Sequence, residues 1–258
     1  MTTASNFQLP RSFKEAKAWK VVKGWVNSDA FYQLKNSVRM FLKTEAILGS
    51  IEGFTGAKTA EFKVVVLGKK NSGKTSLINN LCDVDVSKTA PTHGVAETNA
   101  YWPVKLTNGS EPIIVRLQFW DAGVWCLTDE RSAMLQKLKL QQSEFADAVL
   151  YVCTSTDYKS FTEVQNMIRL NSEPKPLPKT KVLVMTRTDQ WVRRAVNSRN
   201  LRSIESEYSV RSYGISNVIG KVAHEKKDSI ELLNFLCCKL LQSRNAEQLN
   251  AAARKGSI

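Results

Sequence analysis

A phosphate-binding motif constrains the fold of this chain more than any other feature. Residues Gly68 to Thr75 read GKKNSGKT and fit G-x-x-x-x-G-K-[ST] at every fixed position. An apolar run of strand length precedes the motif, and apolar residues at helical spacing follow it from Ser76 to Cys82. The backbone N–H groups of such a loop surround a phosphate, and the start of the helix adds its positive dipole end. The motif therefore predicts a nucleotide-binding loop, in which the Lys74 ammonium reaches the outer phosphates and the Thr75 hydroxyl binds Mg²⁺.

Kinases, ATPases and GTPases share this motif, so other features of the sequence are needed to tell these classes apart. Apolar runs alternate with segments of helical periodicity, which predicts an α/β fold with a mostly parallel sheet and helices on both faces. Six strands are expected, at residues 62–67, 101–106, 113–120, 148–153, 182–185 and 211–215. Helices are expected at residues 76–82, 160–170, 199–208 and 228–241. Asn108-Gly109 predicts a hairpin between the second and third strands, and residues 83–98 are expected to form a functional loop.

Four signals for ligand binding fall directly after predicted strands. Gly68 starts the phosphate motif, and Asp121, Asp189 and Ser216 each follow a strand. Because parallel strands end at the same edge of a sheet, these residues are expected along one rim, where ligands of such sheets bind. An aspartate at a strand end beside a phosphate loop is typical of a Mg²⁺ contact, and Asp121 has that position.

The positive charge of the chain is concentrated outside its middle. The formal net charge is +13, yet residues 63–174 carry 12 basic and 12 acidic side chains. Residues 1–62 carry 9 basic and 5 acidic side chains, and residues 175–258 carry 16 and 7. An anionic membrane, an acidic protein or nucleic acid could use these basic flanks, and a plain solvated surface is an equal alternative. Nucleic acid is the least supported, because no aromatic-basic RNA signature or zinc module accompanies the charge.

The cysteines and the two ends predict a reduced, cytoplasmic chain without a lipid anchor. The five cysteines are scattered, with no zinc spacing, and their odd number argues against a disulfide framework. Thr2 stands where N-myristoylation requires glycine, and the end RKGSI has no prenylation cysteine. No apolar run approaches the length that crosses a bilayer.

The motifs suggest a three-part organisation. Residues 1–60 are expected to be a helical extension and linker, residues 61–243 the nucleotide-binding domain, and residues 244–258 a frayed basic tail. In the extension, helices are expected at 10–23 and 30–48, followed by a linker at 49–60. The extension either packs on the domain or docks on a partner, and the sequence leaves both open.

The order of the motifs resembles that of Ras-superfamily small GTPases over residues 62–243. Thr92-His93-Gly94 is similar to switch I, whose threonine closes on Mg²⁺ and the γ-phosphate, and Trp120-Asp121-Ala122-Gly123 is similar to the opening of switch II. Thr186-Arg187-Thr188-Asp189 is similar to the guanine motif, in which the aspartate accepts hydrogen bonds from base N1 and N2 groups that adenine lacks. Ser216-Asn217 is similar to the last guanine-side loop, with Ser212 as a weaker candidate.

This resemblance implies a P-loop NTPase G domain that binds GTP or GDP with Mg²⁺. It implies switch regions near residues 86–98 and 121–135, through which an effector protein would dock. The implied nucleotide-binding residues are Gly68, Lys70, Asn71, Ser72, Gly73, Lys74, Thr75, Ser76, Thr92, Gly123, Thr186, Arg187, Asp189, Ser216 and Asn217, and the implied Mg²⁺ contacts are Thr75, Thr92 and Asp121.

Four further segments narrow the resemblance to one group. The segments 101–106, 119–123, 146–150 and 160–161 are similar to the Rem- and Rab-like small GTPases of the ciliogenesis and planar polarity effector complex. That group also carries an N-terminal extension and lacks a lipidated tail. The resemblance implies a place at the ciliary basal body and partners similar to Inturned, Fuzzy and Wdpcp.

Three departures from the Ras pattern concern hydrolysis. Lys70 replaces a small residue of the phosphate loop, Arg187 replaces the lysine of the guanine motif, and Val124 follows Gly123 where Ras proteins have a glutamine. Because that glutamine orients the attacking water, intrinsic GTP hydrolysis is expected to be slow and no catalytic residue is assigned. Lys70, His93 or a partner residue could substitute for it. A GAP-dependent hydrolase and a nucleotide-insensitive adaptor therefore stay open beside a GTP-dependent switch.

Overall fold

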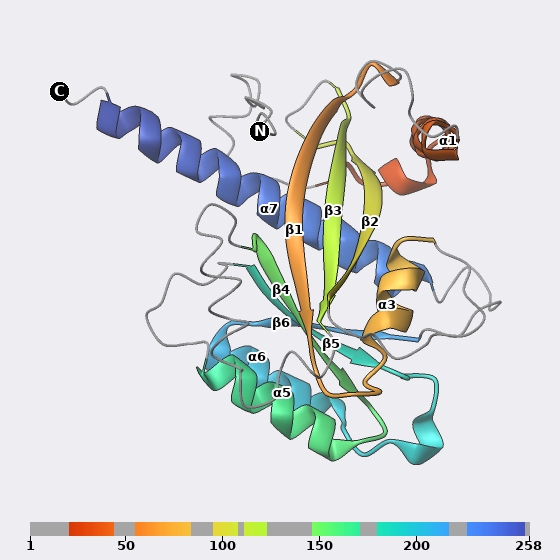
Figure 1. The fold of residues 1–258 in the computed structure, drawn as a ribbon, viewed down its shortest axis with the longest axis vertical. Helices are drawn as coiled ribbons and strands as arrows, with labels where there is room; N and C mark the ends of the chain where they lie inside the picture. The colour runs from red at the N-terminus through yellow and green to blue at the C-terminus, as the bar shows by residue number, and fades with distance from the viewer. Residues whose placement is uncertain are drawn as a thin grey trace. The chain divides into compact units, whose positions relative to one another are not determined.

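Strands and helices alternate along the chain (Figure 1). The computed structural model describes residues 21–43, 55–83, 95–107, 111–122, 146–170, 180–216 and 226–255. Its elements in chain order are η2 (Trp25–Asn27), α1 (Asp29–Lys43), β1 (Lys58–Leu67), α3 (Lys74–Leu81), β2 (Val95–Val104), β3 (Ile113–Ala122), β4 (Ala148–Thr154), α5 (Tyr158–Leu170), β5 (Thr180–Thr186), η4 (Trp191–Arg193), α6 (Ser198–Tyr208), β6 (Arg211–Ile215) and α7 (Lys226–Lys255). All six predicted strands are present, and the α/β prediction is confirmed.

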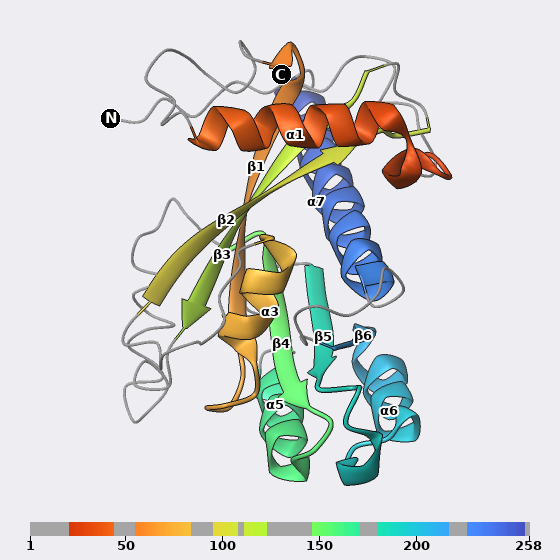
Figure 2. The same ribbon diagram turned by 90° about the vertical axis from the view of Figure 1, so that its right-hand side faces the viewer.

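The strands form one six-stranded sheet of order β2-β3-β1-β4-β5-β6. The strands β1, β4, β5 and β6 are parallel, with Val65 opposite Val149 and Val152 opposite Val184. The hairpin strands β2 and β3 run in opposite directions (Figure 2). Every residue of β4 is buried, as expected of a central parallel strand that helices cover on both faces. The sheet is therefore mixed and mostly parallel, as predicted.

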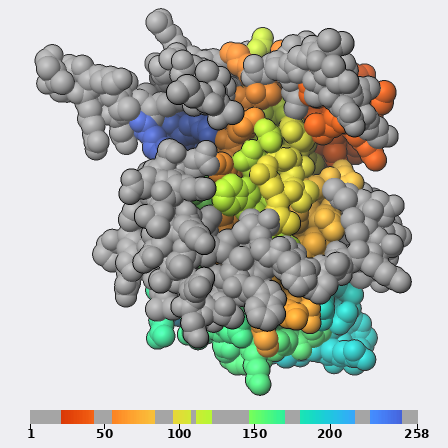
Figure 3. Space-filling model, in the orientation of Figure 1, coloured from red at the N-terminus to blue at the C-terminus, as the bar shows by residue number. Residues whose placement is uncertain are grey.

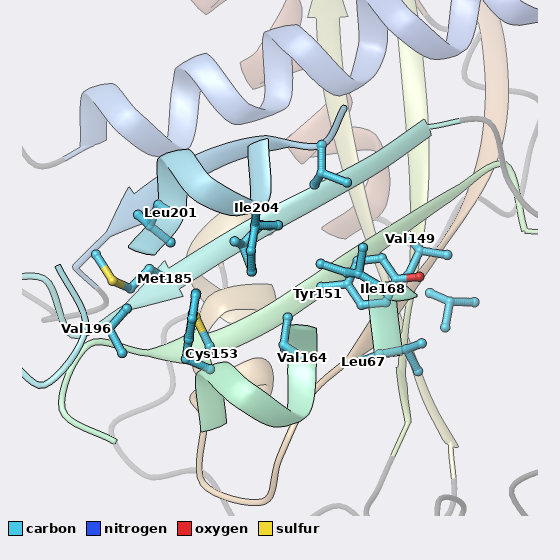
Figure 4. Packing of buried hydrophobic residues seen from close by; sticks show 14 residues of the cluster. Leu67, Val149, Tyr151, Cys153, Val164, Ile168, Met185, Val196, Leu201 and Ile204 are labelled. Carbon is cyan, nitrogen blue, oxygen red and sulfur yellow. The ribbon is translucent and has the colours of Figure 1, made fainter. Parts of the chain in front are cut away.

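A hydrophobic cluster fixes α5 and α6 on one face of the parallel strands (Figure 4). Tyr151 and Met185 contribute from the strands, Ile168 from α5 and Ile204 from α6, and all four are buried. Clusters of this kind are close-packed, so the helices hold the strands in fixed register. The loops at the carboxyl ends of β4 and β5 consequently start from a rigid base.

The chain divides into two compact units. One comprises the described residues within 1–61, 101–117 and 234–258, and the other those within 62–100 and 118–233. The phosphate loop, Asp121, Asp189 and Ser216 all belong to the second unit. The division of the sequence at residues 60/61 and 243/244 stays a prediction.

In the first unit, residues 21–43 pack against the ends of β2 and β3. The amide of Val22 donates to the Lys105 carbonyl at 2.8 Å, and Trp25 Nε1 donates to the Pro103 carbonyl at 3.1 Å. The Phe31 ring stands edge-on to Trp102 at 5.1 Å between centroids. This part of the extension therefore packs on the sheet strands, which was one of the two alternatives that the sequence left open.

The expected helix at 10–23 is wrong at its end, since Val21 forms a β-bridge with Leu106 and residues 23–24 form a turn. Residues 10–20 lie outside the described part. The bridge depends on a partner 85 positions away in the sequence, so local periodicity could not indicate it.

Other boundaries also differ from prediction. The strand β1 begins at Lys58, inside the expected linker, and β2 begins at Val95, inside the expected loop. Both starts lack an apolar run, because the strand there is stabilised by its sheet neighbours rather than by local propensity. The expected fraying after Arg244 is also wrong, since α7 continues to Lys255. Its last part, RNAEQLNAAARK, is rich in strong helix formers but has a weak apolar stripe.

Among the described helices, none combines the length and apolar character needed to cross a membrane.

Candidate nucleotide-binding site

The phosphate loop connects β1 to α3, and its glycines stand where side chains do not fit. A Cβ on Gly68 would lie 2.1 Å from the Val152 carbonyl oxygen. Gly73 caps α3 in the left-handed region, at φ 88°, and a Cβ there would meet the Thr186 side chain at 3.2 Å. The amide of Ser72 donates to the Lys69 carbonyl at 3.2 Å, which closes a turn inside the loop. Glycine at both fixed positions of the motif thus follows from close backbone packing.

Lys74 is a buried cation within this loop. It is 7% exposed, and its Nζ donates to the carbonyls of Gly68 at 3.0 Å and Lys69 at 3.2 Å. Burial lowers the pKa of Lys74, and the Asp121 charge opposes that shift. A buried ammonium is costly unless charge balances it, so the loop favours an anionic ligand.

Thr75 and Asp121 meet beside the loop. The Thr75 hydroxyl donates to Asp121 Oδ2 at 2.5 Å, and Asp121 is 3% exposed. A hydroxyl and a carboxylate are the hard oxygen ligands that Mg²⁺ prefers. The described residues contain no group of three or more His, Cys, Asp or Glu that could hold a metal. Mg²⁺ is commonly held by one or two protein oxygens together with phosphates and waters, so the pair fits a nucleotide-bound ion.

The end of β5 is tied directly to the phosphate loop. Thr186 donates through Oγ1 to the Ser72 carbonyl at 2.6 Å, and Arg187 donates through Nη2 to the Asn71 carbonyl at 3.2 Å. Ser155, just after β4, donates through Oγ to the Arg187 carbonyl at 2.6 Å. These hydrogen bonds hold the strand-end motif and the phosphate loop in one arrangement.

Asp189 and Ser216 lie together although 27 positions separate them. The Ser216 hydroxyl donates to Asp189 Oδ1 at 2.9 Å, and both residues are partly exposed. A carboxylate can accept several hydrogen bonds at once, so Asp189 retains acceptor capacity for a ligand. The pair lies at the carboxyl ends of β5 and β6, the edge where the sequence predicts a rim.

The structure places most of the predicted residues on this edge. Lys70 and Asn71 are exposed, Ser76 is half-buried on α3, and Ser72 Oγ is buried without a hydrogen-bond partner in the described part of the chain. Thr92, Gly123 and Asn217 lie outside the described residues, as do His93 and Val124. Ser212 does not reach this edge, because its hydroxyl donates to Glu205 Oε1 at 2.6 Å.

One residue pair at the site was missed by the sequence reasoning. Lys69 Nζ forms an ion pair with Asp157 Oδ2 at 2.9 Å, from the turn between β4 and α5. The hydrogen bond between them raises the pKa of Lys69 and lowers the pKa of Asp157. Asp157 also follows a strand end closely, so the rule that indicated Asp189 could have indicated it.

A phosphate loop with a buried lysine, a Thr–Asp pair beside it and a second aspartate at a neighbouring strand end define a P-loop domain of the GTPase class. Comparisons with known proteins agree with this class. A family described as "50S ribosome-binding GTPase" matches residues 63–187. "ADP-ribosylation factor-like protein 3" of Caenorhabditis elegans is 25% identical over 158 residues, which are 61% of this chain and 77% of that protein.

Two further relatives are both named "Ciliogenesis and planar polarity effector 2". The protein of Xenopus laevis is 33% identical over 174 residues, 67% of each chain, and that of Xenopus tropicalis is 32% identical over 166 residues. The latter match covers 64% of this chain and 62% of the relative, so this chain spans less than two thirds of that protein. The chain belongs to the small GTPase family of ciliogenesis and planar polarity effector 2, whose GTPase domain implies guanine-nucleotide binding.

Proposed function

We propose that this chain is a guanine-nucleotide-dependent binding switch that hydrolyses GTP slowly and docks effector proteins. The observation that carries the proposal is the hydrogen-bonded set that joins the phosphate loop to the guanine-side motif, through Thr186 to Ser72 and Arg187 to Asn71. A site of this kind holds phosphates and base in one rigid frame. A ligand shifts a conformational equilibrium only through different affinities for the two states, and contacts to a firmly held nucleotide would supply that difference.

Each end of the nucleotide has a candidate recognition group. Lys74 and the backbone of the phosphate loop would hold the phosphates, and Thr75 with Asp121 would hold Mg²⁺. When bound, Mg²⁺ neutralises the charge of the phosphates. Asp189, oriented by Ser216, would accept from the N1–H and N2–H groups of guanine. Adenine offers neither donor there, so this carboxylate supports a preference for guanine.

Slow hydrolysis is inferred from the sequence after Asp121. The segment Asp121-Ala122-Gly123 is followed by Val124, an apolar side chain that cannot orient water. Lys70 and His93 remain the candidates within the chain for that task. With the phosphates held and the water unpositioned, a long-lived GTP state is the expected consequence.

The family relationship supports a role in cilium assembly. The Xenopus relatives carry ciliogenesis and planar polarity in their names, and this chain matches 67% of one of them. We infer that the effectors are subunits of the corresponding complex at the ciliary base, bound through the switch regions near residues 86–98 and 121–135. Nucleotide would act by ordering these segments, as in other GTPases.

The first experiment identifies the nucleotide that the purified chain releases on denaturation, with no nucleotide added during preparation. We expect GTP, because binding without rapid hydrolysis retains the triphosphate. GDP would show that GTP is hydrolysed despite Val124, and Lys70 and His93 would become the residues to test as the groups that orient the water. An empty pocket that also fails to bind added GTP would contradict the proposal and favour a nucleotide-insensitive adaptor.

A second measurement separates a switch from an adaptor. Effector affinity is measured with GDP and with a non-hydrolysable GTP analogue, for the wild-type chain and for Lys74→Ala. The switch requires tighter binding with the GTP analogue and loss of that difference in the variant. Equal affinities in all four cases, with a folded variant, would exclude a switch.

A further inference from the structure

Two large apolar side chains project into solvent just after the guanine-side motif. Trp191 is 74% exposed and Val192 is 76% exposed, and both lie in the short helix η4. Every residue from 190 to 195 is exposed, and we call this segment the Trp191 tip. Atoms in the teal to cyan of residues 180–216, the range that includes the tip, lie at the surface in the lower part of Figure 3. Among the large apolar residues in the described part of the chain, Trp191 and Val192 are the two most exposed.

Hydrogen bonds fix the backbone of the Trp191 tip. The amides of Ala195 and Val196 both donate to the Ser155 carbonyl, at 2.7 and 3.0 Å, and the Val196 side chain is fully buried. Within the tip, the amide of Arg193 donates to the Gln190 carbonyl at 3.2 Å. The apolar side chains are therefore presented on a fixed turn, so binding through them would cost little ordering of the backbone.

Arginines flank the apolar pair. Arg193 and Arg194 follow it directly, and Arg187 and Arg199 lie on either side, all four exposed. Within the tip, Arg194 Nη2 donates to the Thr188 carbonyl at 3.0 Å, and this hydrogen bond fixes the Arg194 side chain. The acidic neighbour Asp189 accepts a hydrogen bond from Ser216. The tip thus combines two exposed apolar side chains, Trp191 and Val192, with an excess of positive charge.

We propose that the Trp191 tip binds the surface of an anionic lipid bilayer. Trp191 and Val192 would enter the headgroup region, and Arg193, with Arg199, would contact lipid phosphates. Tryptophan favours the membrane–water interface, and arginine pairs well with phosphate oxygens. Two projecting side chains offer far less than the roughly 1,000 Å² that a stable protein interface needs, whereas they suffice for shallow insertion aided by charge.

The test is flotation of the full chain with vesicles of phosphatidylcholine containing about one third phosphatidylserine. Trp191→Ser with Val192→Ser is expected to weaken binding about tenfold or more, and Arg193→Gln about fivefold. Tyr158→Ser and Arg169→Gln are the controls, because Tyr158 is an exposed aromatic residue and Arg169 an exposed arginine, both on α5. Both controls should bind as the wild type does, and binding of the wild type should fall as salt rises.

Depth of insertion is read from tryptophan fluorescence with brominated phosphatidylcholine in the same vesicles. Because the chain has six tryptophans, the signal of Trp191 is isolated by comparison with Trp191→Phe, and quenching that this variant removes would support the proposal. Wild-type protein that stays unbound, or tip variants that bind as tightly as the wild type, would overturn it. Self-association in sedimentation that only the tip variants lose would also overturn it, and would assign the tip to a second copy of the chain.

Discussion

Gly68 is the residue whose identity the backbone dictates most strictly. A Cβ at this position would lie 2.1 Å from the Val152 carbonyl oxygen, and neither the Cβ, which is fixed to the backbone, nor the carbonyl oxygen can rotate away. Gly68→Ala must therefore push β1 and β4 apart at the end that carries the phosphate loop. We expect a loss of about 1–3 kcal/mol in the free energy of unfolding, together with weaker nucleotide binding. Urea denaturation and a GDP titration measure the two effects.

Ser203→Ala is the matched control for Gly68→Ala. Ser203 is exposed in α6, where alanine is the better helix former, so stability should be unchanged or slightly higher. If Gly68→Ala proves as stable as this control, the close approach of Val152 does not exist in solution.

The site residues that the sequence indicated are those for which one local rule was enough. Asp121 lies at the end of β3, while Asp189 and Ser216 follow β5 and β6, and the rule that parallel strands end at one edge brings them together. The contacts between Thr186 and Ser72, or between Lys69 and Asp157, join residues 114 and 88 positions apart. Such pairs depend on how strands are registered, which the sequence pattern does not specify.

Among the elements, α1 has a main aromatic anchor in Phe31. Phe31 is buried between Trp25 and Trp102, at 6.0 and 5.1 Å between ring centroids. Phe31→Ala should cost about 3–5 kcal/mol, because it removes a large side chain and leaves a cavity. Hydrogen exchange should report the loss at the Val22 amide, which donates to the Lys105 carbonyl.

Gln33→Ala is the control on the same helix, because Gln33 is exposed. Its exchange at Val22 should match the wild type. Equal protection in Phe31→Ala and Gln33→Ala would mean that residues 21–43 do not depend on this aromatic contact.

Elements were predictable where burial leaves a periodic trace in the sequence. The strands β4 and β5 are apolar runs because they are central and covered on both faces. The start of β2 reads Val-Ala-Glu-Thr and lies in an edge strand of the sheet, so it carries no such run. The last turns of α7 form through alanine, glutamine and glutamate propensity, which hydrophobic periodicity does not detect.

For the whole molecule, nucleotide binding should appear as stability. A ligand that binds only the folded chain stabilises it by about 2.7 kcal/mol at a concentration of 100 Kd. For a protein of this size, that corresponds to a rise of about 5–10 °C in Tm. GDP with Mg²⁺ should produce this rise and ADP should not. The Asp189 carboxylate can accept hydrogen bonds from the N1–H and N2–H groups of guanine, and adenine lacks both donors.

Two variants identify the source of that rise in Tm. Lys74→Ala should remove the response to GDP, since it deletes the buried cation that donates to the Gly68 and Lys69 carbonyls and would contact phosphate. Asp189→Asn should move the response from guanine toward xanthine nucleotides, because the amide nitrogen can donate to the carbonyl that replaces the guanine amino group. A rise in Tm that is equal for GDP and ADP, or that survives Lys74→Ala, would place the nucleotide elsewhere in the chain. A response of Asp189→Asn to GDP that equals the wild type would remove Asp189 from base recognition while leaving the phosphate loop intact.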